Sequence, residues 1–169
     1  MTSFVALLRG VNLGKRQLKM EDLRRIASEL GFGNPSTFIA SGNLLFESGK
    51  SEEMLKAELE EALERHMGAQ VGVMIRTARE MGEAAAACPF DVPGNRAVAI
   101  FLDGPAPSDA ADQARNLTNE RIALGGREIY VHYPAGQGPS KLAIPAAANG
   151  TARNMNTVAK LAELAKGKA

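Results

Sequence analysis

The sequence predicts an α+β fold made of two ferredoxin-like-related units, a β-α-β-β-α-β unit followed by a β-α-β-β-α unit. Short apolar runs of strand length alternate along the chain with longer segments whose apolar residues recur every three or four positions. The same succession starts again after a turn-rich stretch at residues 89–95. With 169 residues, 45% of them apolar, the chain is long enough for two small cores. We therefore expect units at residues 1–88 and 96–169, joined by a linker at 89–95.

The first unit follows from local signals along residues 1–88. The near-continuous apolar run at 4–8 is typical of a central strand. Gly31 closes the helix that follows, and Ser51 caps a second helix that ends at Gly68. The segment Ser41-Gly42-Asn43 between two apolar runs indicates a hairpin. The expected elements are a strand at 4–8, a helix at 20–30, strands at 37–39 and 44–46, a helix at 51–67 and a strand at 71–75.

The second half begins after a short alanine-rich helix for which Thr77 and Glu80 form a capping box. Gly125-Gly126 suits the tight turn of a hairpin. Ser108 is expected to cap a helix. The expected elements are a strand at 97–102, a helix at 108–116, strands at 121–124 and 129–133, a long loop at 134–151 and a last helix from about residue 154.

Composition excludes several classes of protein. Twenty basic and nineteen acidic residues give a formal charge of +1, which argues against a dedicated duplex binder. The single cysteine, Cys88, excludes an internal disulfide and fits a reducing compartment. The apolar run at 4–8 is too short for a signal peptide, and no stretch approaches the roughly 18–20 apolar residues of a membrane helix. We expect a cytoplasmic protein without a membrane partner. The sequence carries no signal for an oligomeric state.

Four segments together resemble one bacterial family, the "domain of unknown function 1697" family. They are FVALLRGVNLG, LGFGNPSTFIASGNLLFES, IYVHYPAGQGPSKL and TARNMNTVAKL, in that order along nearly the whole chain. The resemblance implies a two-part α+β fold and a cytoplasmic protein without an agreed activity. The chain departs from the family pattern at Lys15, where a second glycine is common, and at Met155, where a tryptophan is common.

The polar residues within these segments are our candidate ligand-binding residues. They comprise cations, amides and hydroxyls without a carboxylate, a combination that suits an anion. We expect their loops to line one cleft between the two halves. The set is Arg9, Asn12 and Lys15 in the opening loop, Ser41 and Asn43 in the hairpin, Ser140 and Lys141 in the late loop, and Arg153, Asn154, Asn156 and Thr157 at the last helix.

The start of the last helix is the strongest part of this set. Free backbone N–H groups and the positive end of the helix dipole favour a phosphate or carboxylate there. Arg153 lies just outside that end and is expected to be exposed. The alternative is that Thr151 or Asn154 only caps the helix while Arg153 points into water.

The remaining candidates also have structural alternatives. The glycine-bearing loop at 134–141 can present N–H groups to an anion, but it lacks the spacing of a Walker loop and, taken alone, is more typical of a plain surface loop. Asn43, next to a glycine, can serve turn geometry alone. Arg9 can form a buried ion pair with a helix carboxylate.

Catalytic and metal-binding patterns are absent from the sequence. His66 and His132 are far apart and lie outside the candidate set, and Cys88 is expected to be a small packed residue. No paired-cysteine, HExxH or paired-carboxylate motif occurs, so we expect no metal and no cofactor.

Three functions follow. The first is an enzyme or sensor that holds a small phosphate- or nucleotide-like anion between the halves, with Arg9, Lys141 and Arg153 stabilising negative charge. The second is single-stranded nucleic-acid binding, which is less favoured because the chain has 5% aromatic residues and no tryptophan. The third is a regulatory or interaction protein whose polar set only ties the halves together.

Overall fold

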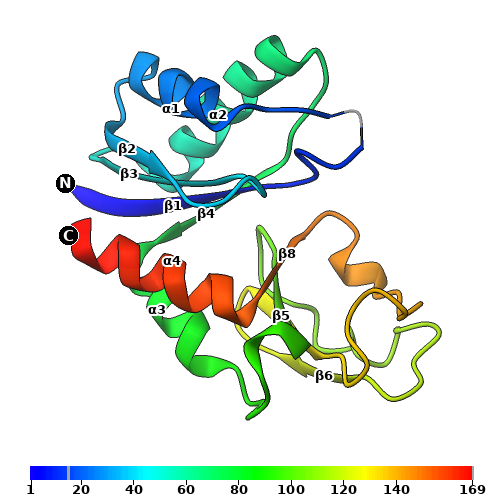
Figure 1. Ribbon diagram of the computed structural model, residues 1–169. Helices are drawn as coiled ribbons and strands as arrows, with labels where there is room; N and C mark the ends of the chain where they lie inside the picture. The colour runs from blue at the N-terminus through cyan, green and yellow to red at the C-terminus, as the bar shows by residue number, and fades with distance from the viewer. Residues whose placement is uncertain (15, 169) are drawn as a thin grey trace. The chain divides into compact units, whose positions relative to one another are not determined.

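The computed structural model describes residues 1–14 and 16–168, which form two compact units (Figure 1). The first unit contains Met1–Met81 and Leu161–Ala169, and the second contains Gly82–Lys160. Each has a four-stranded antiparallel sheet, which confirms the expected α+β class. The unit boundaries differ from the expected ones, because residues 89–95 lie inside the second unit and the last helix is divided between the two. The spacing of apolar residues predicts a helix, but it does not show which unit each turn of the last helix belongs to.

The sheet of the first unit has the strand order β2-β3-β1-β4. The helices α1 and α2 lie together on one face (Figure 1), where Leu55, Leu59 and Leu63 are fully buried among residues of the strands. On β1, Val5 and Leu7 point to the opposite face and are also buried, which explains the continuous apolar run. The elements are β1 (Thr2–Leu8), α1 (Met20–Glu29), β2 (Gly33–Thr37), β3 (Asn43–Ser48), α2 (Glu52–Met67) and β4 (Val73–Thr77).

Local capping signals in the first half are confirmed. Ser51 Oγ accepts a hydrogen bond from the Met54 backbone N–H at 3.3 Å, and Gly68 ends α2 with a φ of 72°. Thr77 and Glu80 form both bonds of a capping box, at 2.9 and 3.1 Å, at the start of α3 (Ala78–Ala87). These features were predictable because each depends on residues close together in the chain.

One strand of the first unit lies earlier than expected. The strand expected at 37–39 is β2, Gly33–Thr37, and Ile39 has left the sheet with a φ of 53°. The turn that follows the strand is held by the buried side chain of Asn43, whose amide donates a hydrogen bond to the Phe38 carbonyl at 2.9 Å.

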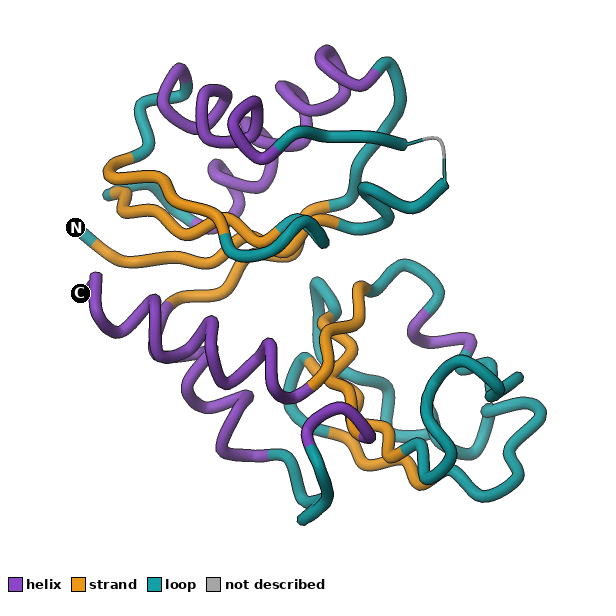
Figure 2. Tube along the Cα trace, in the orientation of Figure 1, coloured by secondary structure: helices purple, strands orange, loops and turns teal. Residues whose placement is uncertain are grey.

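The sheet of the second unit has the order β6-β7-β5-β8 and is covered on one face by loops (Figure 2). Val98, Ile129 and Val131 from the strands pack there with Ala110 and Ile144 from the loops. The elements are β5 (Ala97–Phe101), β6 (Arg121–Leu124), β7 (Glu128–His132) and β8 (Thr151–Asn154), with single 3-10 turns at Gly94–Arg96 and Pro145–Ala147. The last helix, α4 (Met155–Lys168), belongs to this unit as far as Lys160.

Two expectations for the second half were wrong. The helix expected at 108–116 is a series of turns, in which Ala110 N–H bonds the Pro107 carbonyl and Ala114 N–H bonds the Ala111 carbonyl. Its apolar side chains are alanines, which offer too little surface to dock a helix. The short strand β8 was missed because its pairing with β5 joins residues about fifty positions apart in the chain.

None of the helices in the described part of the chain combines the length and the apolar character that a membrane crossing requires.

Candidate functional site

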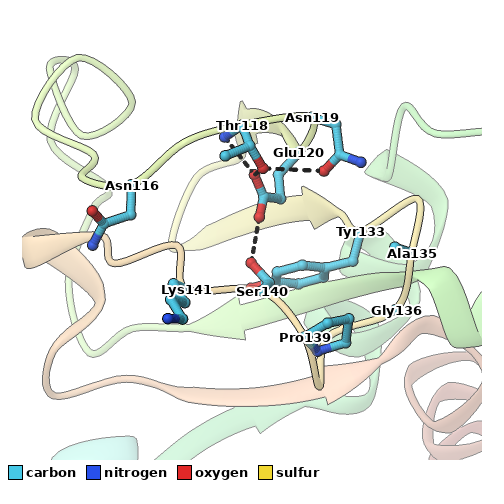
Figure 3. A pocket seen from close by; sticks show the side chains of 10 residues that line it. All are labelled: Asn116, Thr118, Asn119, Glu120, Tyr133, Ala135, Gly136, Pro139, Ser140 and Lys141. Atoms are coloured by element: carbon cyan, nitrogen blue, oxygen red, sulfur yellow. Dashed lines mark hydrogen bonds between the residues drawn. The ribbon is translucent and has the colours of Figure 1, made fainter.

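A pocket with a volume of about 440 Å³ lies within the second unit (Figure 3). Residues 116–120 and 133–141 line it. The hairpin brings these two segments together, because Arg121 at the start of β6 pairs with His132 at the end of β7. The chain before β6 and the chain after β7 therefore meet at the same end of the hairpin.

Glu120 is the charged centre of the pocket. It is 8% exposed, and its carboxylate accepts hydrogen bonds from the Ser140 hydroxyl, from the Thr118 N–H at 2.9 Å and from the Thr118 hydroxyl at 3.2 Å (Figure 3). The Ser140 hydroxyl first, and the Thr118 backbone N–H second, lower the pKa of Glu120 to about 2. The carboxylate is therefore ionised at neutral pH and retains lone pairs that can accept further hydrogen bonds.

Tyr133 provides an apolar wall beside this charge. Its ring packs with the core cluster of the second unit and also lines the pocket. Burial, with a smaller contribution from the negative charge of Glu120, raises the pKa of the Tyr133 hydroxyl above its usual value. The hydroxyl is thus neutral over the physiological range.

Two features of the loop at 133–141 are suited to an anionic group. Lys141 lines the pocket and is exposed. Gly136 has a φ of 86°, and a Cβ at this position would lie 3.0 Å from Arg96 Nη1, so glycine lets the loop pass close to the guanidinium. The pocket therefore has one cation on its lining and a second next to its wall.

The predicted site residues are distributed over both units. Ser140 and Lys141 line the pocket. Arg153 does not, because its side chain leaves β8 on the face opposite Ala152, and Ala152 packs with the Tyr133 cluster. Three other candidates, Asn154, Asn156 and Thr157, are in the second unit outside the pocket lining, and Arg9, Asn12, Ser41 and Asn43 are in the first unit. Lys15 lies outside the described residues.

The environment of Arg153 differs from the expectation of an exposed guanidinium. The residue is 7% exposed, and Nη1 donates hydrogen bonds to Thr151 Oγ1 at 2.7 Å and to the Ala152 carbonyl at 2.9 Å. Burial lowers the pKa of Arg153 to about 10. The helix cap itself is confirmed, since Asn154 Oδ1 accepts the Thr157 N–H at 2.9 Å. Arg153 is buried because it lies in β8, a strand directly before α4, and not in an exposed loop.

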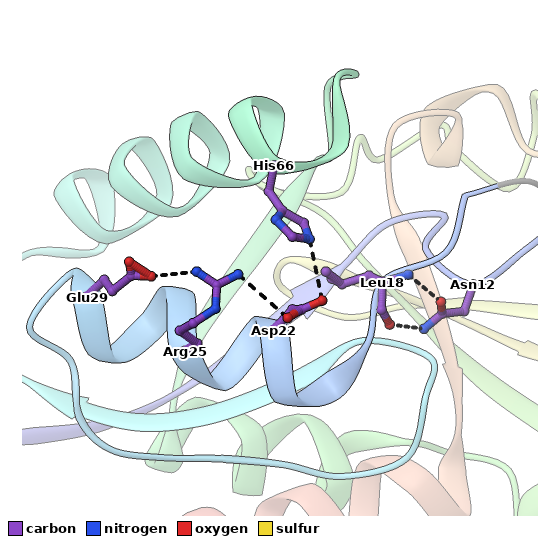
Figure 4. A network of polar contacts seen from close by, with 6 residues as sticks. All are labelled: Asn12, Leu18, Asp22, Arg25, Glu29 and His66. Carbon is purple, nitrogen blue, oxygen red and sulfur yellow. Dashed lines mark hydrogen bonds and ion pairs between the residues drawn. The ribbon is translucent and has the colours of Figure 1, made fainter.

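Asn12 and Asn43 brace loops of the first unit. The Asn12 carboxamide donates to the carbonyls of Leu18 and Ala40 and accepts the Leu18 N–H at 2.7 Å (Figure 4). Asn43 is fully buried and bonds the Phe38 carbonyl and the Ser41 hydroxyl. For Asn43, the turn-geometry alternative is therefore the one that the structure supports.

Sequence reasoning missed Glu120, Tyr133 and Thr118 as site residues. The available signal was the register of the predicted hairpin around Gly125-Gly126, which already implied that residues near 120 and 133 are neighbours. Glu120 and Thr118 lie outside the four segments from which the candidate residues were taken.

The histidine, cysteine and carboxylate side chains of the described residues form no metal centre. No three His, Cys, Asp or Glu side chains of the described residues are grouped so that they could hold an ion. His66 Nε2 lies 3.7 Å from Asp22 Oδ2 on the helices of the first unit (Figure 4). His132 Nδ1 accepts a hydrogen bond from Arg121 Nε at 3.1 Å.

Comparison with known proteins identifies a family. Residues 1–130 match the family model described as protein of unknown function (DUF1697). The chain belongs to this family. The DUF1697 match includes Glu120 and ends before Ser140, so it covers only the first of the two segments that line the pocket.

A solved structure shares the fold of this DUF1697 chain. The conserved bacterial protein SP0830 from Streptococcus pneumoniae superposes with a TM-score of 0.82 at 24% identity, covering 98% of this chain and 99% of that one. At this identity the similarity establishes the fold alone. No curated protein matches the chain.

Proposed function

We propose that the second unit binds a small, hydroxyl-bearing anion, such as a sugar phosphate or a nucleotide, in the pocket around Glu120. The observation that carries this proposal is an ionised carboxylate, held by Ser140 and Thr118, in the same pocket as Lys141. The ligand is thus assigned to a pocket inside one unit rather than to a cleft between the halves.

The charges constrain the chemistry of the ligand. Glu120 repels a bare anion, but its free lone pairs accept hydrogen bonds from hydroxyl groups. Lys141 supplies the positive charge that an anionic group needs. The ring of Tyr133 offers an apolar wall for the carbon skeleton of the ligand. A volume of about 440 Å³ falls within the usual range for small-molecule sites.

Binding is better supported than catalysis. A carboxylate with a pKa of about 2 is a weak base near neutral pH, far from the value that general-base catalysis favours. Glu120 is therefore assigned a role in orienting hydroxyl groups. A cytoplasmic location for this activity is supported by the single cysteine.

We also infer that the first unit is ferredoxin-like. Its β-α-β-β-α-β order and its antiparallel strand order β2-β3-β1-β4 support this assignment.

Calorimetry and thermal shift on the full chain test the pocket. The probes are inorganic phosphate, ribose, ribose 5-phosphate, AMP and a short single-stranded oligonucleotide. We expect ribose 5-phosphate to bind more tightly than inorganic phosphate or ribose. Lys141→Ala should weaken ribose 5-phosphate binding about tenfold or more, because a charge-assisted hydrogen bond is lost.

Two further variants separate the parts of the proposal. Glu120→Gln should weaken binding of ribose 5-phosphate more than that of inorganic phosphate, because only the former has hydroxyls for the carboxylate. Lys160→Ala removes an exposed lysine of the same unit that does not line the pocket, and should leave binding unchanged. Equal affinities for the parent, Lys141→Ala and Lys160→Ala would show the proposal to be wrong, as would binding of the oligonucleotide alone.

A further inference from the structure

We propose that the loop end of the first unit, formed by residues 9–14, 16–19 and 38–42, is a docking surface for an acidic segment of a partner protein, with Leu13 and Ile39 as its apolar anchors. This surface is independent of the pocket in the second unit. Exposed apolar side chains, an unusual backbone conformation and the charge of the two loops support the assignment.

The two loops lie side by side. Asn12 Nδ2 donates a hydrogen bond to the Ala40 carbonyl, which ties the opening loop to the loop between β2 and β3. A Cβ at Gly42 would lie 2.7 Å from Val11 Cγ2, so the second loop packs directly on the first. Leu13 and Ile39 are the chain neighbours of the two bonded residues and are therefore presented at the same end of the unit.

Both anchors are large apolar residues in contact with solvent. Leu13 is 71% exposed and Ile39 is 50% exposed. Single exposed apolar residues are common on protein surfaces, but a pair on two joined loops forms the centre of a patch. The Asn12 bonds to Leu18 keep the base of the opening loop in place (Figure 4), so the anchors are held by a braced backbone.

The backbone of Ile39 is the decisive feature. Its φ of 53° lies in the left-handed region, which β-branched residues rarely adopt. Hydrogen bonds fix the chain on both sides, from Phe38 N–H to the Asn43 carbonyl at 3.1 Å and from Asn12 to the Ala40 carbonyl. Glycine or asparagine suits this backbone better, and a half-exposed isoleucine contributes little to the core. A contact with another molecule explains why a strained position presents an apolar side chain outward.

The charge of the loops selects the partner. Residues 1–20 and 33–46 contain no aspartate or glutamate, while the opening loop carries Arg9, Lys15, Arg16 and Lys19. Arg9 and Lys19 are exposed, and Arg16 Nη2 donates to the Gln70 carbonyl at 2.6 Å. Apolar anchors among cations complement a segment that carries both acidic and apolar side chains.

Acidic residues of α2 limit the surface on one side. Gln70 lines a separate hollow together with carboxylates of that helix, Glu60, Glu61 and Glu64. Glu21 and Asp22 in the first turn of α1 limit the surface beside Lys19. The acidic segment is therefore assigned to the part of the surface around the two anchors, away from Gln70 and from α1.

A protein partner fits better than a membrane or a nucleic acid. Two aliphatic side chains provide less apolar insertion than one acyl chain, which by itself anchors a protein only marginally. Single-stranded nucleic acids are bound by stacking on aromatic rings, and neither anchor is aromatic. An apolar centre surrounded by polar and charged side chains is the usual arrangement of a protein interface.

The test uses the full chain to select from a displayed library of random peptides about twelve residues long, a length suited to span one such surface. We expect the retained peptides to be enriched in aspartate and glutamate and to contain a large apolar residue. Leu13→Ser and Ile39→Asn should each lower the affinity for a selected peptide about tenfold or more, as for other interface anchors. Met54→Ser, which removes a 51% exposed apolar residue of α2 in the same unit, should leave the affinity unchanged.

The Ile39→Asn variant also separates binding from folding. Asparagine tolerates a positive φ, so this variant should melt at a higher temperature than the parent while it binds the peptide less well. The proposal is overturned if no acidic peptides are enriched, or if Leu13→Ser binds them as well as Met54→Ser does. It is equally overturned if phosphatidylserine vesicles or an oligonucleotide bind in a Leu13-dependent way and no peptide does.

Discussion

The two units cover one face of a four-stranded antiparallel sheet in different ways. In the first unit, α1 and α2 cover it with side chains such as Leu55, Leu59 and Leu63, all fully buried. In the second unit, the loops at 103–120 and 133–150 cover it, and their buried apolar side chains are Ala110, Tyr133 and Ile144. The helices place long aliphatic side chains against the sheet and leave a hollow of about 400 Å³ between α1 and α2, whereas the pocket of about 440 Å³ lies among the covering loops.

The loop cover has a further consequence for chemistry. The backbone N–H and C=O groups of a loop are not paired in a regular hydrogen-bond ladder. They therefore form hydrogen bonds within the loop or with a neighbouring loop. Arg115 and Ala143 exchange two backbone hydrogen bonds, at 2.7 and 3.0 Å, and thereby join the two covering loops. The hydrogen bond from the Ser140 hydroxyl to Glu120 adds a third connection. Polar groups that hold the loops together thus also line the pocket.

The largest expected effect is a loss of stability in the first unit. It tests whether the helices α1 and α2 pack more tightly on their sheet than the covering loops do on theirs. Leu59→Ala should lower the free energy of unfolding by about 2–5 kcal/mol, because the fully buried side chain leaves a cavity between α2 and the sheet. Ile144→Ala, in a covering loop, should cost only about 2 kcal/mol because the loop can relax into the space. Urea unfolding of both variants measures the difference. Equal losses of unfolding free energy in Leu59→Ala and Ile144→Ala would show that the helices and the loops pack equally well on their sheets.

Arg153 tests whether the two faces of the second sheet are independent. Arg153→Ala should destabilise the protein by about 2 kcal/mol, since a buried side chain and its hydrogen bond to Thr151 are lost. Arg153→Met should lower the stability less than Arg153→Ala, because methionine retains most of the volume of the buried side chain. Neither variant should change ribose 5-phosphate affinity, because Arg153 lies on the face away from the pocket. Thermal unfolding and binding calorimetry check both points, and a selective loss of affinity would contradict the separation.

The smallest expected effect is an acid-dependent loss of stability in the second unit. The pKa of Glu120 is about 2 in the folded protein, compared with 4.5 for an ordinary glutamate. Its contribution is therefore fully present above pH 4.5 and is lost as the pH falls from 4.5 towards 2. Ser140→Ala removes the largest cause of the lowered pKa and should reduce this pH-dependent loss.

Tyrosine fluorescence can follow this effect in the second unit alone. The chain has no tryptophan, and both tyrosines, Tyr130 and Tyr133, belong to that unit. In urea unfolding followed by tyrosine fluorescence, the free energies of unfolding of the parent and Ser140→Ala should differ most above pH 4.5 and converge as the pH falls towards 2. Thr77→Ala offers a comparison, because it removes a helix cap that holds no pocket residue. An identical acid response in the parent and Ser140→Ala would contradict the role assigned to Ser140.

Sequence alone determined the features that depend on nearby residues. The caps at Ser51 and Thr77, the end of α2 at Gly68 and the hairpin around Gly125-Gly126 were all predictable. So was the α+β class, because apolar periodicity records the local geometry of strands and helices. Ser140 and Lys141 were also selected from the sequence, and they line the pocket.

Only the tertiary structure decided which polar residues meet. Glu120 lies outside the four segments that supplied the predicted set, and its hydrogen bond with Ser140 joins residues twenty positions apart in the chain. The burial of Arg153 depends on the pairing of β8 with β5, about fifty positions earlier. The loop at 108–116 had helical spacing but lacked the apolar side chains needed to dock as a helix. Local geometry is encoded by neighbours in the chain, whereas burial and the ionisation of a side chain are set by contacts between distant segments, which a single sequence does not display.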